Sequence, residues 1–135
     1  MNFNFYFKLF VLTIPVFFLI DMVWLSTMIP SFYRKRLGHL MSKKPNWTAA
    51  FIFYFIFIIG ILFFAVAPNL PDGDWQQSLF LGAMYGLFTY STYNLTNLAT
   101  LKNWSPVVVF VDILWGMFLC GSVASISFLI GKWLM

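Results

Sequence analysis

Residues 85–104, YGLFTYSTYNLTNLATLKNW, decide how this chain folds. The segment has the length of a membrane-spanning helix, yet hydroxyl, phenol and carboxamide side chains recur along it. The flanking segments, SLFLGAM before it and SPVVVFVDILWGMF after it, are far more apolar. A polar stripe within a bilayer either holds helices together or lines a site. The other apolar segments are therefore expected to pack around this stripe.

The composition places the chain among membrane proteins. Of its 135 residues, 61% are hydrophobic and only 9% are charged, whereas soluble domains carry about 25% charged residues. The length is enough for about four spanning helices of roughly 20 residues each. We therefore predict an all-α fold, a polytopic integral membrane protein built as a four-transmembrane-helix bundle, with residues 1–135 forming a single membrane domain.

Boundary residues divide the chain into four expected spans. Pro30 should end the first helix, because proline cannot continue the hydrogen-bond ladder. Asp74, with Gln77 three residues later, is typical of a helix N-terminus. Ser105 followed by Pro106 is a second such start. The expected helices cover about residues 5–28, 46–67, 74–101 and 105–134, with a basic loop at 30–45.

Positive charge indicates the orientation in the membrane. Six of the eight Lys and Arg residues fall in the loop 30–45 or at Lys102. By the positive-inside rule this side faces the cytoplasm, and both termini face outward. The net charge of +4 therefore reflects topology, and no nucleic-acid partner is expected. The expected partners are membrane lipids, whose anionic headgroups would meet Arg34, Lys35, Arg36, Lys43 and Lys44.

The basic loop has two interpretations that the sequence leaves open. Tyr33, Leu37, Leu40 and Met41 fall on one face of a helix, which could lie in the headgroup layer. Alternatively, the loop is solvated and only sets the topology.

The third expected helix has a distinct polar face. Its small residues at the outer end would let a neighbouring helix approach, and its hydroxyl and amide groups at the inner end offer hydrogen bonds. On a 3.6-residue wheel this face comprises Gly82, Tyr85, Gly86, Thr89, Tyr93, Thr96, Asn97 and Thr100, bordered by Tyr90 and Asn94.

Two carboxylates are expected deep in the membrane at one level. Asp21 and Asp112 each lie several residues from the cytoplasmic end of a helix, as do Tyr93, Asn94 and Asn97. At about 1.5 Å per residue, all five share a layer roughly 8–13 Å from that end. A charge at this depth is costly and must face protein or water. We expect the two carboxylates within about 10 Å of each other, where they should not both ionise easily.

A tryptophan follows each of these aspartates at the same spacing. The pairs Asp21/Trp24 and Asp112/Trp115 are three residues apart, which places indole and carboxylate on one helix face. An indole can donate a hydrogen bond or face a cation. The simpler alternative is that these polar groups only hold the helices together. The candidate ligand-binding residues are Asp21, Trp24, Tyr93, Asn94, Asn97, Asp112 and Trp115.

The same residues carry a resemblance to a known family. The pattern runs from Asp21-x-x-Trp24-Leu25 through Tyr33-Arg34 and the segment TYNLTNLATL (92–101) to Asp112-x-x-Trp115-Gly116. It resembles the bacterial membrane family called domain of unknown function 2177 over nearly the whole chain. The resemblance implies a small multi-pass protein of the bacterial inner membrane and implies no particular activity. Members of that family more often carry aspartate at the position of Asn94, which implies a third carboxylate that this chain lacks.

Three functions remain open from the sequence. The first is a protein that binds or transports a proton, a cation or a small polar solute at Asp21 and Asp112, with homo-oligomerisation as one way for so small a chain to form a path. The second is a membrane enzyme acting on lipid, with the aspartates as acid and base and Tyr93 as donor. The third is a non-catalytic scaffold or subunit. With one isolated histidine, His39, and one cysteine, Cys120, neither a metal site nor a cofactor is expected, and no catalytic residue is assigned.

Overall fold

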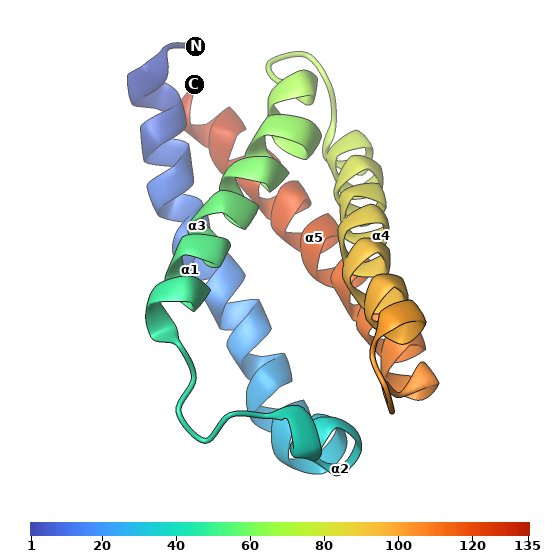
Figure 1. Cartoon of the computed structure of the whole chain (residues 1–135). Coiled ribbons are helices and arrows are strands. Elements are labelled where there is room, and N and C mark those ends of the chain that lie inside the picture. The colour runs from blue at the N-terminus through green and yellow to red at the C-terminus, as the bar shows by residue number, and fades with distance from the viewer.

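The computed structural model describes all 135 residues and contains four long helices (Figure 1). They are α1 (Phe3–Met28), α3 (Trp47–Ile61), α4 (Trp75–Thr100) and α5 (Pro106–Leu134). With their helical extensions, the segments Phe3–Leu40, Trp47–Asn69 and Pro106–Leu134 are long and apolar enough to cross a membrane. The remaining helix, α4, has 26 residues but carries the polar stripe. The predicted fold class, an all-α polytopic membrane protein with a four-helix bundle, is confirmed.

Side-chain caps fix where the helices begin. The Asp74 carboxylate accepts a hydrogen bond from the Gln77 N–H at 2.9 Å, and the Ser105 hydroxyl accepts one from the Val108 N–H at 3.3 Å. Each cap satisfies an N–H group that has no partner within its helix. Both caps are as the sequence predicts. Asn46 caps α3 in the same way, through the Ala49 N–H at 3.1 Å.

The prediction that Pro30 ends the first helix is wrong. The helical path continues through a π-helical turn (Ile29–Tyr33), the short helix α2 (Arg34–Leu37) and a 3-10 turn (Gly38–Leu40). A π-turn widens the helix locally and so accommodates a residue that lacks an N–H group. The Ser31 hydroxyl donates to the Thr27 carbonyl at 2.6 Å and supports this turn. Much of the expected loop 30–45 is therefore helical.

The closest helix pair is α4 with α5, which run side by side along their length (Figure 1). A methyl group placed on Gly82 would lie 2.7 Å from the Ala124 Cβ, and one on Gly86 would collide with the backbone of Gly116. These distances are shorter than van der Waals contact, so the backbones meet directly at both glycines. The predicted close contact at Gly82 and Gly86 is confirmed.

The half of the bundle that carries the termini is filled by a packed core. There α1 crosses α5, where the Thr13 and Ser127 hydroxyl oxygens lie 2.9 Å apart and fully buried. Leu9, Ile58 and Val123 are also fully buried here. The helix α3 joins through its C-terminal π-turn, Leu62–Val66, which contacts both α4 and α5. The centre of this half, where α1, α3 and α5 meet, is therefore filled by side chains.

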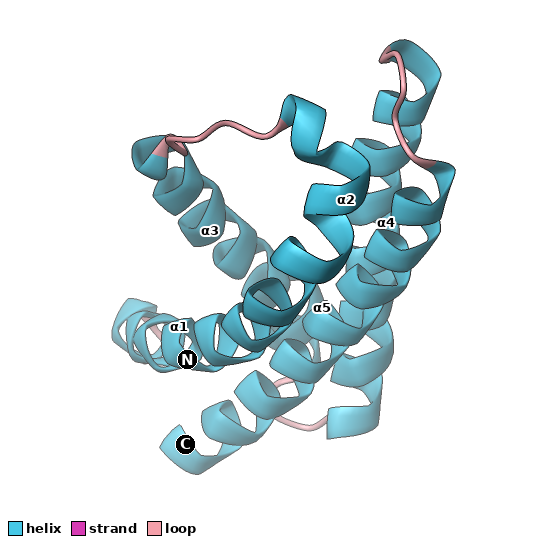
Figure 2. Cartoon of the chain, turned by 90° about the horizontal axis from the view of Figure 1, so that it is seen from below, coloured by secondary structure: helices cyan, strands magenta, loops and turns pink.

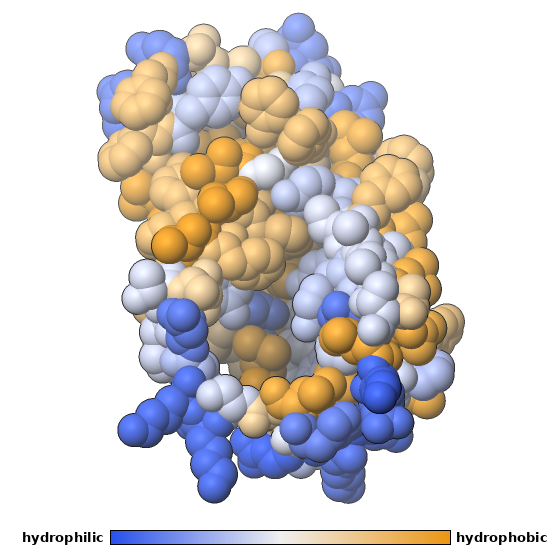
Figure 3. All heavy atoms as spheres, viewed as in Figure 1, coloured by the Kyte–Doolittle hydropathy of each residue, from blue (hydrophilic) through white to orange (hydrophobic).

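The two ends of the bundle differ in charge. Both termini lie at one end, and α2 lies across the opposite end, between α3 and α4 (Figures 1 and 2). This second end carries hydrophilic residues along its rim (Figure 3), and the five basic side chains of residues 34–44 are all exposed. Between the two ends the bundle presents large apolar side chains to its surroundings, such as Phe63, Phe110 and Phe118. An apolar belt of this kind is expected of a surface that faces lipid.

Candidate functional site

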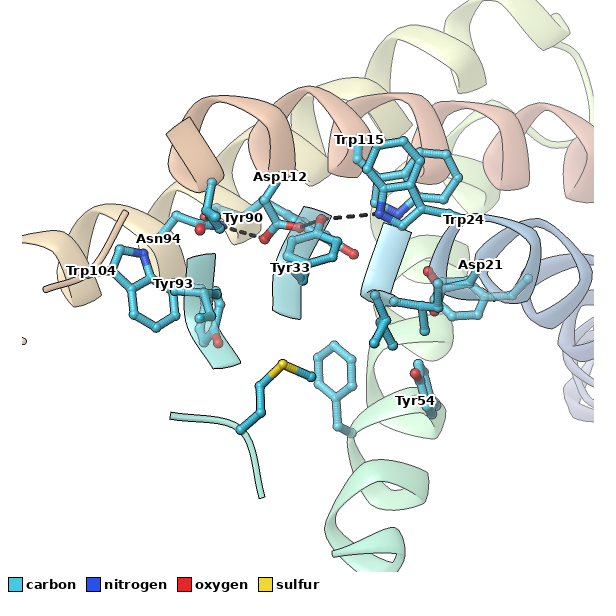
Figure 4. Close-up of a pocket in the computed structure, with 17 residues that line it drawn as sticks. Asp21, Trp24, Tyr33, Tyr54, Tyr90, Tyr93, Asn94, Trp104, Asp112 and Trp115 are labelled. Carbon is cyan, nitrogen blue, oxygen red and sulfur yellow. Dashed lines mark hydrogen bonds between the residues drawn. The ribbon is translucent and has the colours of Figure 1, made fainter. Parts of the chain in front are cut away.

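A cavity of about 290 Å³ lies in the half of the bundle near the basic end. All four long helices contribute to its wall, and so do residues 29–41, which we call the covering segment (Figure 4). The covering segment contributes side chains spaced four residues apart, a helical repeat that keeps them on one face. These are Ile29, Tyr33, Leu37 and Met41.

Six of the seven predicted ligand-binding residues line this cavity. They are Asp21, Trp24, Tyr93, Asn94, Asp112 and Trp115. They come from three helices far apart in the sequence, as the shared depth of Asp21 and Asp112 predicts. The seventh, Asn97, is half-buried one turn further along α4 and does not line the cavity.

Asp112 is the centre of the hydrogen-bond network. One carboxylate oxygen accepts from the Tyr33 hydroxyl at 2.8 Å, and the other accepts from the Asn94 amide at 2.7 Å (Figure 4). The Asn94 amide also donates to the Tyr90 carbonyl of its own helix at 3.0 Å. Asp112 therefore ties α5 to α4 and to the covering segment. Each oxygen still has a free lone pair, because a carboxylate can accept about four hydrogen bonds.

The two tryptophans stack on each other. The rings of Trp24 and Trp115 are parallel within 5°, with centroids 4.3 Å apart. The Trp24 indole N–H donates to the Tyr33 hydroxyl at 3.1 Å. The indoles thus form one aromatic wall between α1 and α5, and the hydrogen bond of Trp24 goes to Tyr33 and not to its own helix neighbour, Asp21.

Asp21 lies on the α1 side of the same cavity and is 6% exposed. The Tyr54 hydroxyl, from α3, points toward it (Figure 4). Its carboxylate lacks the two close hydrogen bonds that Asp112 has. No Lys, Arg or His side chain lines the cavity, so neither carboxylate is neutralised by a basic group from the protein.

Three buried polar atoms around the cavity have no hydrogen-bond partner. They are the Oδ1 of Asn94 and the Nε1 atoms of Trp104 and Trp115. Asn94 is fully buried, and Trp104 is 9% exposed. A buried polar atom without a partner costs about 1–3 kcal/mol. A site that leaves one acceptor and two donors unpaired beside two carboxylates has the features of a ligand-binding cavity.

The stripe on α4 is rotated relative to the sequence prediction. Asn94, expected at the border of the stripe, is fully buried, whereas Tyr93, expected at its centre, is 57% exposed. The buried positions Ser78, Gly82, Gly86 and Asn94 are multiples of four residues apart. Contact between α4 and α5 follows such an i, i+4 row, which is inclined to the helix axis. The row therefore drifts away from a face drawn on a straight 3.6-residue wheel.

Three aromatic residues of the cavity were not identified as site residues from the sequence. Tyr33 lies beyond Pro30, in the segment expected to be a loop. Tyr54 lies on α3 and is the only polar side chain in the run FIFYFIFIIG. Trp104 lies in the α4–α5 link, and its ring meets Tyr93 edge to face at 5.9 Å. The i, i+4 spacing of Tyr33, Leu37 and Met41 was the available signal for the covering segment.

The fold and the cavity define a class: a polytopic helical membrane protein with two carboxylates in an intramembrane cavity. The family comparison agrees that this is a membrane protein. A family model described as "Predicted membrane protein (DUF2177)" matches residues 6–129. The chain belongs to this family, as its resemblance in sequence predicts. The chain matches no curated protein and no solved structure.

Proposed function

We propose that this protein binds a cationic solute in the cavity between Asp21 and Asp112. The observation that carries the proposal is the pairing of two carboxylates with the unpartnered, fully buried Oδ1 of Asn94. All three groups accept hydrogen bonds, and two of them bring negative charge when ionised. A solute with positive charge and several N–H donors would satisfy all three.

The electrostatic cost of burying two carboxylates supports a cation. A single carboxylate within a membrane helix costs about 2.5–3.5 kcal/mol on the insertion scale. The cavity lining offers no basic side chain to offset this cost. A cation bound between the carboxylates would supply the missing charge, and the Trp24–Trp115 stack offers an aromatic face of the kind that attracts cations.

Binding is supported more directly than transport. The cavity lies near the basic end, whereas the half of the bundle near the termini is closed by buried side chains such as Leu9, Ile58 and Val123. Passage of a solute would require this packed half to open. Transport therefore needs an alternating movement of helices, with binding at the carboxylates as its first step.

One observation favours a second candidate, a membrane enzyme that acts on lipid. Asp112 also lines an apolar groove between α3 and α4 that reaches the lipid-facing surface, and an enzyme of this kind needs such a lateral opening. The aspartates would then act as acid and base. Tyr33, which is bonded to Asp112, would replace Tyr93 as the nearby donor. A purely structural scaffold has no use for the unpaired polar atoms of the cavity.

The proposed location is the bacterial inner membrane, with the basic end in the cytoplasm and both termini outside. Arg34, Lys35, Arg36, Lys43 and Lys44 are exposed at that end. We propose that they contact anionic lipid headgroups, because Lys and Arg next to a spanning helix attract the negative cytoplasmic leaflet.

A binding measurement with n-butylammonium tests the proposal. The protein in lipid nanodiscs should bind this probe, and Asp112→Asn should weaken binding at least about tenfold, because removing one partner of a buried charge pair is costly. Asp72→Asn removes the same charge from an exposed turn and should leave binding unchanged. Equal binding by the wild type and the Asp112→Asn variant would rule out the proposed site.

A further inference from the structure

A second, larger hollow continues from the carboxylate cavity. This groove has a volume of about 700 Å³ and lies between α3 and α4. Phe53, Tyr90, Tyr93 and Asp112 line both spaces. The groove and the cavity therefore adjoin at these residues, and the size of the groove is within the range of about 300–1,000 Å³ that is usual for ligand pockets.

The groove opens sideways, toward the hydrocarbon of the membrane. The helices α3 and α4 diverge from the π-turn Leu62–Val66, where α4 is in contact, toward the basic end (Figure 1). The space-filling view shows a hollow on this face, with hydrophobic residues above it and residues of intermediate hydropathy on one side (Figure 3). Its rim includes Phe53 at 50% exposure and Phe88 at 62% exposure. A molecule dissolved in the bilayer could enter here without passing through water.

The groove offers mostly apolar contact, and its one carboxylate lies where it meets the cavity. Phe53, Phe57 and Phe88 contribute rings to its wall. The hydroxyls of Thr89 and Thr92 also face this region, but they donate to carbonyls of their own helix at 2.8 and 2.6 Å. Asp112, at the junction with the cavity, is the only carboxyl group of the groove lining and carries negative charge when ionised.

We propose that the solute is an amphiphile with a primary ammonium head and a single hydrocarbon chain, taken up laterally from the bilayer. The ammonium lies between Asp112, Asp21 and the Asn94 Oδ1, and the chain lies in the groove between α3 and α4. This inference rests on the proposed function, because it uses the same carboxylates, and it adds the chemical class of the solute and its route.

The acceptors of the site favour a primary ammonium over a quaternary one. A primary ammonium has three N–H donors, which matches two carboxylates and one amide oxygen. A quaternary ammonium has no N–H and would leave the Asn94 oxygen unpaired at the usual cost of a buried acceptor. The groove in turn favours a hydrocarbon chain over a polar tail, since the rings of Phe53, Phe57 and Phe88 offer a polar group no hydrogen-bond partner.

The test compares a short and a long amine in nanodiscs of zwitterionic lipid. The probes are n-butylammonium and n-dodecylammonium, and the variant is Thr92→Trp, which places a bulky ring in the groove. Thr96→Trp is the matched control, because Thr96 is also exposed on α4, its hydroxyl is also bonded to a carbonyl four residues earlier, and it does not line the groove.

We expect Thr92→Trp to weaken dodecylammonium binding at least about tenfold, since an overpacked site excludes its ligand. Butylammonium binding by Thr92→Trp, and binding of both amines by Thr96→Trp, should stay within about twofold of the wild type. A dodecylammonium analogue with a diazirine in mid-chain should cross-link to residues 53–57 and 88–93.

The outcomes separate this inference from the function on which it rests. If both amines bind through Asp112 but Thr92→Trp affects neither, the lateral groove does not hold the chain and the amphiphile is ruled out, while the cation site stands. If neither amine depends on Asp112, the proposed function fails as well. If N,N,N-trimethyldodecylammonium binds as tightly as dodecylammonium, the inference that the solute carries a primary ammonium head is wrong.

Discussion

Asp112 connects more of this molecule than any other residue of the cavity. Its carboxylate accepts hydrogen bonds from α4 and from the covering segment, and it lines both the cavity and the groove. Interhelical hydrogen bonds in membranes contribute about 0.6 kcal/mol on average. The structural and ligand-binding interpretations of the polar cluster are therefore compatible, because the same carboxylate serves both.

The two roles of Asp112 are separable by the choice of substitution. Asp112→Asn should change the free energy of unfolding by less than about 1 kcal/mol, because the Asn94 amide can turn its free oxygen toward the new N–H group. Asp112→Ala leaves the Tyr33 hydroxyl and the Asn94 amide without their acceptor, at about 1–3 kcal/mol for each unpaired group. Thermal melting in detergent measures both, and equal melting temperatures for the two variants would contradict this account of the network.

For single residues, the sequence predicts which charged side chains line the cavity better than it predicts which aromatic ones do. Asp21 and Asp112 are identifiable because a carboxylate within a spanning helix must face protein or water. No comparable rule applies to Tyr33 or Tyr54, since a phenol is tolerated in the membrane interface as well as in a core. Their positions depend on how the covering segment and α3 pack against the cavity, which no single helix reveals.

At the scale of the helix, the small residues of α4 determine the geometry of the bundle. Gly82 and Gly86 let the backbone of α4 meet that of α5, and this close approach brings Asn94 to Asp112 further along the same row. The glycines thus position the site as well as stabilising the helix pair, as small residues commonly do between membrane helices.

Gly86→Leu should therefore destabilise the protein by about 1–3 kcal/mol or more through overpacking. The reason is that a side chain at this position meets the backbone of Gly116, which cannot rotate away. Ala99→Leu is the control, because Ala99 is exposed on the same helix. Melting in detergent should shift for Gly86→Leu only. Unchanged melting of this variant would show that the two backbones are not in contact.

Local signals predict the starts of helices well and their continuation poorly. The caps at Asp74 and Ser105 are as expected, because capping depends on neighbouring residues alone. The path beyond Pro30 is different, since it is stabilised by contacts of Tyr33 with Trp24 and Asp112. Such tertiary contacts override the local preference of proline to end a helix. The rotation of the α4 stripe has a similar origin in its packing against α5.

At the scale of the whole molecule, the exposed basic residues and the cavity lie toward the same end of the bundle. The end that carries the exposed basic residues is also the end near which the cavity lies, whereas the half near the termini is packed. If the basic end is cytoplasmic, as the positive-inside rule predicts, then the carboxylates lie in the cytoplasmic half of the membrane.

Labelling of a single cysteine tests this orientation. Ser42 is exposed in the basic segment, and Ser42→Cys should react with a membrane-impermeant maleimide only after the cytoplasmic side is opened. The native Cys120 is fully buried and should not react in intact membranes, which the unmodified protein verifies. Labelling of Ser42→Cys in intact cells would reverse the predicted topology.

The stacked tryptophans have an optical consequence. Two parallel indoles 4.3 Å apart are close enough for their excited states to couple, so that their ultraviolet transitions shift or split. One chromophore belongs to α1 and the other to α5, so the shift or splitting reports the separation of these two helices. The protein thus contains an intrinsic spectroscopic gauge of any movement at its own site, without an added label.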